Sequence, residues 1–233
     1  MTAPLVSVIM AVRNGERFLR QAIESVLTQN YRPIEIILID GQSVDRTAEI
    51  ARAYPDIRYV YQENTGIANA YNIGIAAAQG EFVAFLSHDD LWPPNKLSVQ
   101  VNYLIAHPDI EYTVAATQFF LEPGSPFPVH ALRNDILEGN RVVRNVEILV
   151  ARRRVFERVG PFDPALCTAE DIDWYARVDD MGIPVTILNQ VLLLKRIHDA
   201  NTTSNTPEHR QNVMQALRLS AQRKRRLAQR EES

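Results

Sequence analysis

Two adjacent carboxylates follow an apolar run in the segment Ser87-His88-Asp89-Asp90, and this tetrapeptide is the strongest chemical signal in the sequence. Residues 82–86, which precede it, are mostly bulky and apolar and contain no turn former, so they predict a strand covered on both faces. Unpaired carboxylates are costly to bury, so a pair at a strand exit is either solvated or held near a cation. Divalent cations take oxygen ligands together with phosphates. A metal-diphosphate site is therefore the chemical hypothesis, and an acidic turn or helix cap is the structural alternative.

The elements that must position this pair alternate between strand and helix. Continuous apolar runs predict strands at 6–12, 34–39, 57–61 and 82–86. Helical spacing, capping residues and composition predict helices at 18–27, 45–54, 66–78 and 96–107. Doubly buried strands that alternate with helices indicate a mostly parallel sheet flanked by helices, with right-handed crossovers.

The pattern is weaker in the second half of the chain. A strand is predicted at 112–120, and the loop-rich stretch 122–144 is interpreted as an excursion over one face rather than a domain boundary. Structure resumes at 146–151 and continues through the basic segment 152–159, and we expect a helix near 171–181 and a strand at 185–194. The tail 208–230 has the composition of a basic helix, which either packs as a solvated terminal helix or contacts an anionic lipid surface.

Three polar clusters follow the predicted strands. Arg13 and Asn14 come after the first strand, and Asp40 ends the second. Asp89 and Asp90 come after the fourth. Because ligands bind beyond the carboxyl ends of strands in an open parallel sheet, these clusters are expected to converge at one edge.

Missing motifs exclude several enzyme classes. No GxGxxG follows the first strand and no GxxxxGK[ST] occurs, so a dinucleotide oxidoreductase and a P-loop NTPase are poor fits. No GxSxG elbow is present, and Cys167 has no clear base partner in the sequence. Covalent catalysis is not indicated.

The composition predicts one large soluble domain. The chain has 233 residues, of which 46% are hydrophobic and 23% charged, and its net charge of −3 argues against a nucleic-acid partner. The single cysteine fits a reducing compartment, and the sequence shows no signal peptide and no apolar run of membrane-spanning length. We therefore expect a cytoplasmic protein, with the basic tail as a candidate peripheral contact to the membrane.

Six blocks, in order and spacing, resemble the family 2 inverting glycosyltransferases. They are VSVIMAVRNG (6–15), LIDGQSVDRT (38–47), NTGIANAYNIG (64–74), GEFVAFLSHDD (80–90), RVFERVGPFD (154–163) and AEDID (169–173). The resemblance implies a GT-A, Rossmann-like α/β fold in a single domain over 1–205. It also implies a nucleotide-binding half at 1–107, an acceptor-binding half at 108–205 and a separate basic tail at 206–233.

The resemblance implies roles at the donor side. The donor would be a nucleotide-diphosphate sugar, with UDP expected, and the cofactor Mn²⁺ or Mg²⁺. Asp40 would contact the base or ribose, and the other nucleotide-binding residues would be Ala11, Arg13, Asn14, Asn69 and Asp89. Asp89 would also bind the metal, with His88 and His198 as further candidate ligands.

On the acceptor side, the resemblance implies that Asp171 is the general base and that Asp90 and Glu170 support the donor sugar. The physics is consistent, because the acceptor hydroxyl must lose a proton as it attacks, and a single in-line displacement needs one base and no protein nucleophile. Asp171 could instead only cap the helix that follows it. The acceptor would carry a hydroxyl group on a glycan or a lipid-linked glycan, in polysaccharide, lipopolysaccharide or glycolipid synthesis.

Departures from the family pattern leave alternatives open. Ser87 stands where the first carboxylate of a DxD motif usually lies, Gly41 replaces a frequent second Asp, and Ala11 replaces a frequent Pro. The serine favours a non-catalytic protein that binds or assembles nucleotide sugars. A sugar nucleotidyltransferase is the other alternative, although residues 11–17 do not form its Gly-rich phosphate loop.

Overall fold

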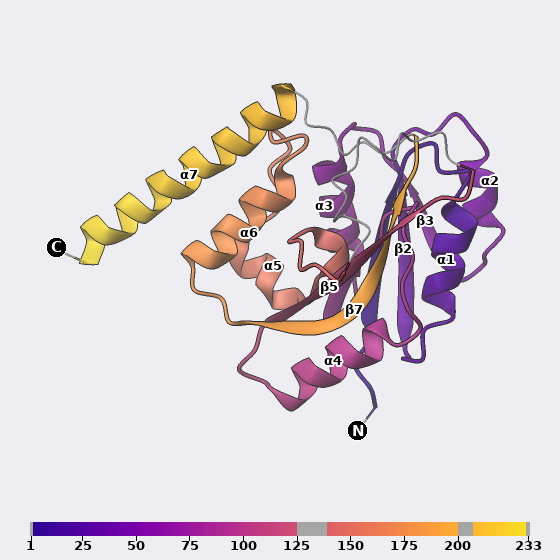
Figure 1. Cartoon of the computed structure of the whole chain (residues 1–233), viewed down its shortest axis with the longest axis horizontal. Coiled ribbons are helices and arrows are strands. Elements are labelled where there is room, and N and C mark those ends of the chain that lie inside the picture. The colour runs from indigo at the N-terminus through magenta and orange to yellow at the C-terminus, as the bar shows by residue number, and fades with distance from the viewer. Residues whose placement is uncertain (1, 125–138, 200–206, 232–233) are drawn as a thin grey trace.

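The strands form one mixed sheet in the computed structural model, which describes residues 2–124, 139–199 and 207–231 (Figure 1). Seven strands lie side by side in the order β3-β2-β1-β4-β6-β5-β7. They are β1 (Val6–Val12), β2 (Ile34–Asp40), β3 (Ile57–Tyr61), β4 (Phe82–Phe85), β5 (Tyr112–Leu121), β6 (Val150–Arg152) and β7 (Val185–Ile197). The predicted α/β fold with a mostly parallel sheet is confirmed.

One short strand runs against the others. β1 pairs in parallel with β2 and β4, β2 with β3, and β5 with β7, whereas β6 is antiparallel to both of its neighbours, β4 and β5. The sequence predicted that structure resumes near residue 146 but did not indicate this reversal. Because of the reversal, the start of β6 lies at the same edge of the sheet as the carboxyl ends of β1, β2 and β4.

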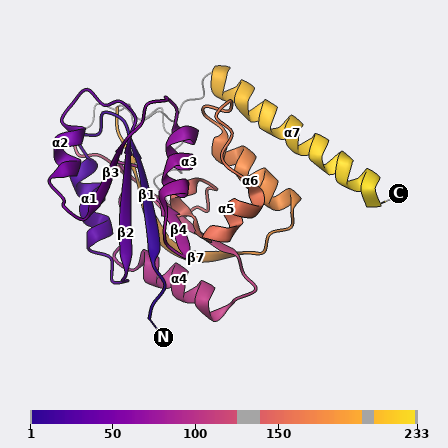
Figure 2. The same cartoon turned by 180° about the vertical axis from the view of Figure 1, so that it is seen from behind.

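Helices cover both sides of the sheet. α1 and α2 lie on one side, and α3, α5 and α6 lie on the other (Figures 1 and 2). α7 runs beside α6 and extends away from the sheet toward the C-terminus. The bounds are α1 (Leu19–Leu27), α2 (Thr47–Arg52), α3 (Ile67–Ala77), α4 (Lys96–Ala106), the 3-10 turn η2 (Val146–Ile148), α5 (Arg153–Val159), α6 (Glu170–Asp180) and α7 (Pro207–Glu231).

The central strands are buried because helices cover both of their faces. All four residues of β4 are buried, as are all residues of β1 except the half-buried Ala11. Gly74 lets α3 approach β1 closely, since a Cβ at this position would lie 2.3 Å from Cγ2 of Ile9. The unbroken apolar runs in the sequence therefore correspond to strands without a solvent-facing side, as their pattern predicted.

The predicted boundaries hold with small shifts. α2 begins two residues later than predicted, where Asp45 Oδ1 accepts the backbone N–H of Thr47 at 3.0 Å. β7 continues three residues past the predicted end, to Ile197. Most of the predicted excursion at 122–144 lies outside the described residues. The predicted basic helix is α7, and within the described chain no helix has the length and apolar content that a bilayer span requires.

Candidate active site

The turn after β1 is tied to the loop after β2 by hydrogen bonds between backbone and side chains. Asn14 adopts a positive φ of 52°, its N–H donates to Ser43 Oγ at 2.8 Å, and its Oδ1 accepts the N–H of Val44 at 3.0 Å. The next N–H, of Gly15, donates to Thr47 Oγ1 at 2.8 Å. These bonds fix Arg13 and Asn14 beside the end of β2, and the Arg13 side chain is exposed.

Asp40 ends β2 with its carboxylate turned into the protein. The residue is 1% exposed, and its two oxygens accept the Tyr59 hydroxyl at 2.7 Å and the backbone N–H of Ser43 at 2.9 Å. Burial, followed by the Asp40 carboxylate, raises the pKa of Tyr59 to about 12, so this phenol remains a donor. The side chain is thus fixed by the loop that borders the candidate nucleotide pocket.

The other predicted nucleotide residues lie around the same edge. Ala11 is half-buried near the end of β1 and pairs with Ile39 of β2. Asn69 lies in the first turn of α3, where its Nδ2 donates to the Thr65 carbonyl at 2.8 Å. The structure places both residues at the edge where the predicted site lies, and their roles toward a nucleotide stay predictions.

The tetrapeptide after β4 is held against the end of β7. Asp90 is 1% exposed, its Oδ2 lies 3.0 Å from Lys195 Nζ, and its Oδ1 accepts the backbone N–H of Arg196 at 2.9 Å. Burial raises the pKa of Asp90 to about 7, while Lys195 opposes that rise. Asp90 is therefore anchored within the protein, in agreement with a supporting role.

Asp89 is the more accessible carboxylate of the pair. Its Oδ2 lies 3.1 Å from Nε2 of His198, a residue that is itself buried. Burial alone would raise the pKa of Asp89, but charge interactions with His88 and Lys195 and the hydrogen bond with His198 hold it below its usual value. The structure therefore brings together two of the three predicted metal ligands.

His88, the third of them, interacts electrostatically with the other two, Asp89 and His198. Its ring lies against Gly15, where a Cβ would be 3.0 Å from the ring Cδ2. Burial lowers the pKa of the imidazole, which favours its neutral form. A role for His88 at the metal stays a prediction.

A third carboxylate, from a distant part of the chain, joins Asp89 and Asp90 in this cluster. Ser87 Oγ donates to Glu147 Oε1 at 2.7 Å, and the same oxygen lies 3.7 Å from Lys195 Nζ. Although burial alone would lower it, the pKa of Lys195 is raised, chiefly by Glu147 and Asp90, so Lys195 remains a cation. Neither Glu147 nor Lys195 carried a signal in the sequence.

Arg196 holds the backbone of the tetrapeptide in place. Its guanidinium lies over the rings of Phe18 and Phe120, at 4.5 and 4.8 Å from their centroids, and its Nε donates to the Asp89 carbonyl at 2.8 Å. Further partners of the guanidinium are Gln21 and Glu122. Sequence reasoning missed this residue, although its position two residues before His198 was a usable signal.

The two acids that the sequence predicts for the acceptor side, Glu170 and Asp171, lie in the first turn of α6. Burial, followed by Glu147, raises the pKa of Asp171 to about 6. Burial is the main cause that raises the pKa of Glu170 to about 8, and the charge of Asp171 is the next. The Oε2 atom of Glu170 is buried without a hydrogen-bond partner among the described residues. At neutral pH Asp171 is mostly ionised and Glu170 mostly neutral, so only Asp171 is poised to accept a proton.

Comparison with models of known protein families shows to which family the chain belongs. Residues 7–159 match the model of glycosyl transferase family 2, which is more than half of the chain. The chain belongs to glycosyl transferase family 2. This result confirms the resemblance seen in the motifs, although the matched region ends before the segment that carries Asp171.

Sequence relatives that are named as glycosyltransferases match most of the chain. An uncharacterized glycosyltransferase of Rickettsia typhi is 34% identical over 216 residues, covering 87% of this chain and 67% of the relative. An uncharacterized glycosyltransferase of Nostoc is 34% identical over 224 residues, covering 84% of this chain and 66% of the relative. Others are much longer, and the chain spans only 36% of a relative from Rickettsia felis.

Solved structures with low sequence identity share the fold. Staphylococcus aureus TarS 1-349 in complex with UDP-GlcNAc is 17% identical, with a TM-score of 0.76 over 94% of this chain and 66% of that protein. Mannosyltransferase PcManGT from Pyrobaculum calidifontis, in complex with GDP-Man and Mn²⁺, is 21% identical, with a TM-score of 0.66 over 93% of this chain and 63% of that protein. Both support the GT-A assignment.

Proposed function

We propose that this chain is an inverting glycosyltransferase that transfers a sugar from a nucleotide-diphosphate donor to a hydroxyl group of a glycan or lipid-linked acceptor. The observation that carries the proposal is that Asp89 meets His198, while Glu147, which is bonded to Ser87 of the same turn, interacts electrostatically with both Asp90 and Asp171. Glu147 thus links electrostatically an acid proposed for the donor side and the acid proposed as the base. A hexosyltransferase of polysaccharide, lipopolysaccharide or glycolipid synthesis fits this arrangement.

The donor-side residues fit a divalent cation shared with a diphosphate. Within the described residues, no group of three or more His, Cys, Asp or Glu side chains is placed to hold a metal by itself. Mg²⁺, however, is usually bound by one or two carboxylates together with substrate phosphates. Asp89 and His198 would supply the protein's share of such a site for Mn²⁺ or Mg²⁺. When bound, the cation would neutralise the charge that builds on the leaving diphosphate.

Asp171 would act as the base. A carboxylate whose pKa is about 6 is mostly ionised at pH 7 and still basic enough to accept a proton from an attacking hydroxyl. One base without a protein nucleophile leads to a single displacement, which inverts the anomeric centre. Asp90, fixed by Lys195, and the neutral Glu170 would support the donor sugar at either side of the reaction.

UDP is the nucleotide that we propose for the donor. Among the structural neighbours, TarS is described in complex with UDP and UDP-GlcNAc and the mannosyltransferase with GDP-Man, so the two precedents differ in their base. Asp40 and its loop would contact the base or ribose, with Arg13 and Asn14 at the mouth of the pocket. The nucleotide-binding half at 1–107 and the acceptor-binding half at 108–205 remain part of the proposal.

Thermal unfolding with UDP, GDP, dTDP or CDP, each with and without Mn²⁺, tests the donor side on wild type and Asp89→Ala. A ligand at a hundred times its dissociation constant stabilises a protein by about 2.7 kcal/mol. We expect one nucleotide to stabilise the wild type only with Mn²⁺, and the effect to disappear in Asp89→Ala. If no nucleotide gives a metal-dependent shift, the enzyme proposal fails and the non-catalytic binding protein favoured by Ser87 takes its place.

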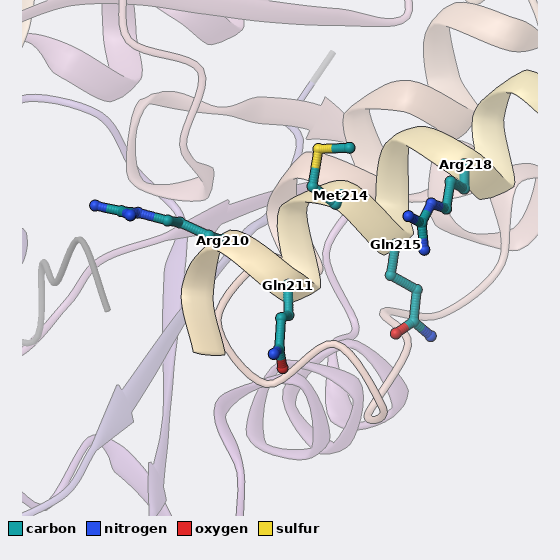
Figure 3. A pocket seen from close by; sticks show the side chains of 5 residues that line it. All are labelled: Arg210, Gln211, Met214, Gln215 and Arg218. Atoms are coloured by element: carbon teal, nitrogen blue, oxygen red, sulfur yellow. The ribbon is translucent and has the colours of Figure 1, made fainter. Parts of the chain in front are cut away.

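We also propose that α7 lets the protein contact the cytoplasmic face of a membrane. Residues 209–230 contain no Asp or Glu, and Arg210, Arg218 and Arg225 are exposed on the helix. Met214 and Leu217 are 51% and 52% exposed beside them. Figure 3 shows Arg210, Met214 and Arg218 along this surface of α7. Basic side chains with exposed apolar neighbours suit an anionic lipid surface, near which each adds about 1 kcal/mol.

A further inference from the structure

Ser87 and Glu147 face each other because β4 and β6 are antiparallel. The paired residues are Phe82 with Arg152, Val83 with Ala151 and Ala84 with Val150. The same register, continued three residues past the last pair, places Ser87 opposite Glu147. Both residues lie just beyond this ladder, Ser87 after β4 and Glu147 in η2, and their hydrogen bond of 2.7 Å joins the two segments there.

The segment that carries Glu147 is itself well anchored. Asn145 caps the short turn η2 by accepting the N–H of Ile148 at 3.3 Å, and its carbonyl accepts the Tyr175 hydroxyl of α6 at 2.9 Å. Glu147 is only 8% exposed. A carboxylate this buried needs a partner of opposite charge or several donors, and Lys195 and Ser87 supply them.

Lys195 makes the charge balance at the donor side depend on Glu147. Its ammonium lies 3.0 Å from Asp90 and 3.7 Å from Glu147, and it also interacts electrostatically with Asp89. One cation thus faces three carboxylates. With Glu147 present, Lys195 is shared among the three carboxylates, so it compensates less of the negative charge of Asp89, which also meets His198.

We propose that Glu147 is a positioning residue that supplies, from the turn η2 just before β6, the carboxylate that position 87 lacks. It binds Lys195 and the Ser87 hydroxyl, which keeps Lys195 from competing for Asp89 and holds the turn that presents Asp89 to the donor. This inference rests on the proposed function, because it concerns how Asp89 meets the diphosphate and its cation. It assigns no direct contact between Glu147 and the substrate.

If this inference holds, a carboxylate at position 87 should be able to replace the one at position 147, and mutation can test this. In Glu147→Gln the charge of Glu147 is removed, so Lys195 interacts with Asp90 and Asp89 only. The metal-dependent binding of the nucleotide should therefore weaken. The double variant Ser87→Asp/Glu147→Gln has a carboxylate near Lys195 again, because residues 87 and 147 are direct neighbours. It should therefore restore the charge balance around Lys195. Ser87→Asp alone would place two carboxylates in contact and should destabilise the metal-free protein.

The experiment measures the Mn²⁺ concentration that gives half of the UDP-dependent thermal shift, together with the unfolding temperature without metal. We expect Glu147→Gln to need about tenfold more Mn²⁺ than wild type, which corresponds to about 1.4 kcal/mol for the loss of one nearby charge. The double variant should return to within about threefold of wild type. Glu111→Gln is the matched control, because Glu111 is also 8% exposed and paired, with Arg154 and Arg158, but lies just before β5 at the opposite edge of the sheet.

The outcomes separate this inference from the proposed function. An unchanged Mn²⁺ requirement in Glu147→Gln, or a double variant as weak as the single one, would overturn the inference while the wild-type response still supports the enzyme. A wild type that shows no metal-dependent shift with any nucleotide would overturn both. The metal-free unfolding temperature shows whether each variant is folded, so a weak response in a folded variant is attributed to the site.

Discussion

Leu91 and Leu194 exchange both of their backbone hydrogen bonds, at 3.0 and 2.9 Å, and this pair sets the register of the donor side of the site. The pairing is antiparallel, so Asp90 comes opposite Lys195, and the Asp89 carbonyl reaches Arg196. The Asp89 side chain in turn meets His198. A segment that leaves β4 is thus fixed by the end of a strand more than a hundred residues later in the chain.

Replacement of the base should separate transfer from binding. Asp171→Asn removes the proton acceptor but keeps the size of the side chain, so sugar transfer should fall by about a hundredfold or more. Donor binding should stay near that of wild type, because Asp171 lies on the acceptor side. Transfer assays and nucleotide-dependent thermal shifts measure the two effects. Asp179→Asn, near the end of the same helix, is the control and should transfer normally; an Asp171→Asn variant with normal transfer would remove this residue from its role.

The acid limb of the pH profile should report the ionisation of Asp171. Because the base acts when deprotonated, the transfer rate should fall as the pH drops through about 6. Burial is the main cause of the raised pKa of Asp171, and the negative charge of Glu147 is the next. Glu147→Gln should therefore move the acid limb to lower pH, measured at saturating Mn²⁺ and donor. A limb that stays in place, or moves to higher pH, would show that Glu147 does not act on the base.

The sequence predicted the edge of the sheet at which the site lies, and the structure explains why it missed the partners. Residues at the carboxyl ends of strands, such as Asp40 and Asp89, follow local apolar runs. Short-range sequence patterns therefore predict that they converge. The contacts of Ser87 with Glu147 and of Asp90 with Lys195 join residues 60 and 105 positions apart. They depend on the direction of β6, a strand of three residues, and on one isolated bridge, neither of which leaves a periodic signal.

Lys96 offers a test of stability that is independent of catalysis. It is fully buried, its Nζ donates to Gln100 Oε1 at 2.7 Å and lies 5.0 Å from the ring centroid of Trp92, and burial lowers its pKa to about 7. Between pH 7 and its ordinary pKa near 10.5, the unfolded chain binds a proton that the folded protein lacks. Stability contributed by this group therefore rises with pH across that window, by up to about 1.4 kcal/mol per pH unit.

Lys96→Met should remove this dependence. Urea unfolding at pH 7, 8 and 9 should show the variant more stable than wild type at pH 7, with the difference shrinking as the pH rises. The lost hydrogen bond to Gln100 costs only about 1 kcal/mol, which is smaller than the burial penalty removed. Lys224→Met, at an exposed lysine on α7, should follow the pH dependence of wild type. Parallel curves for wild type and Lys96→Met would contradict the idea that the folded protein buries a neutral amine here.

The last prediction concerns the surface of α7. Arg210, Arg218 and Arg225 are exposed on the helix next to Met214 and Leu217. In cosedimentation, the protein should bind vesicles that contain an anionic lipid but not vesicles of phosphatidylcholine alone, and added salt should release it because the attraction is screened.

Changing all three exposed arginines of α7 to glutamine should weaken vesicle binding by about a hundredfold, since each basic residue contributes about 1 kcal/mol near the surface. The matched control changes Arg46, just before α2, Arg52, at the end of α2, and Arg58, in β3, to glutamine; these elements lie at the far side of the molecule from α7 (Figure 1). Both triple variants lose the same net charge, so a difference between them locates the contact on α7. Equal weakening would mean that general charge attracts the protein, and no binding by the wild type would leave α7 as a solvated helix packed on α6.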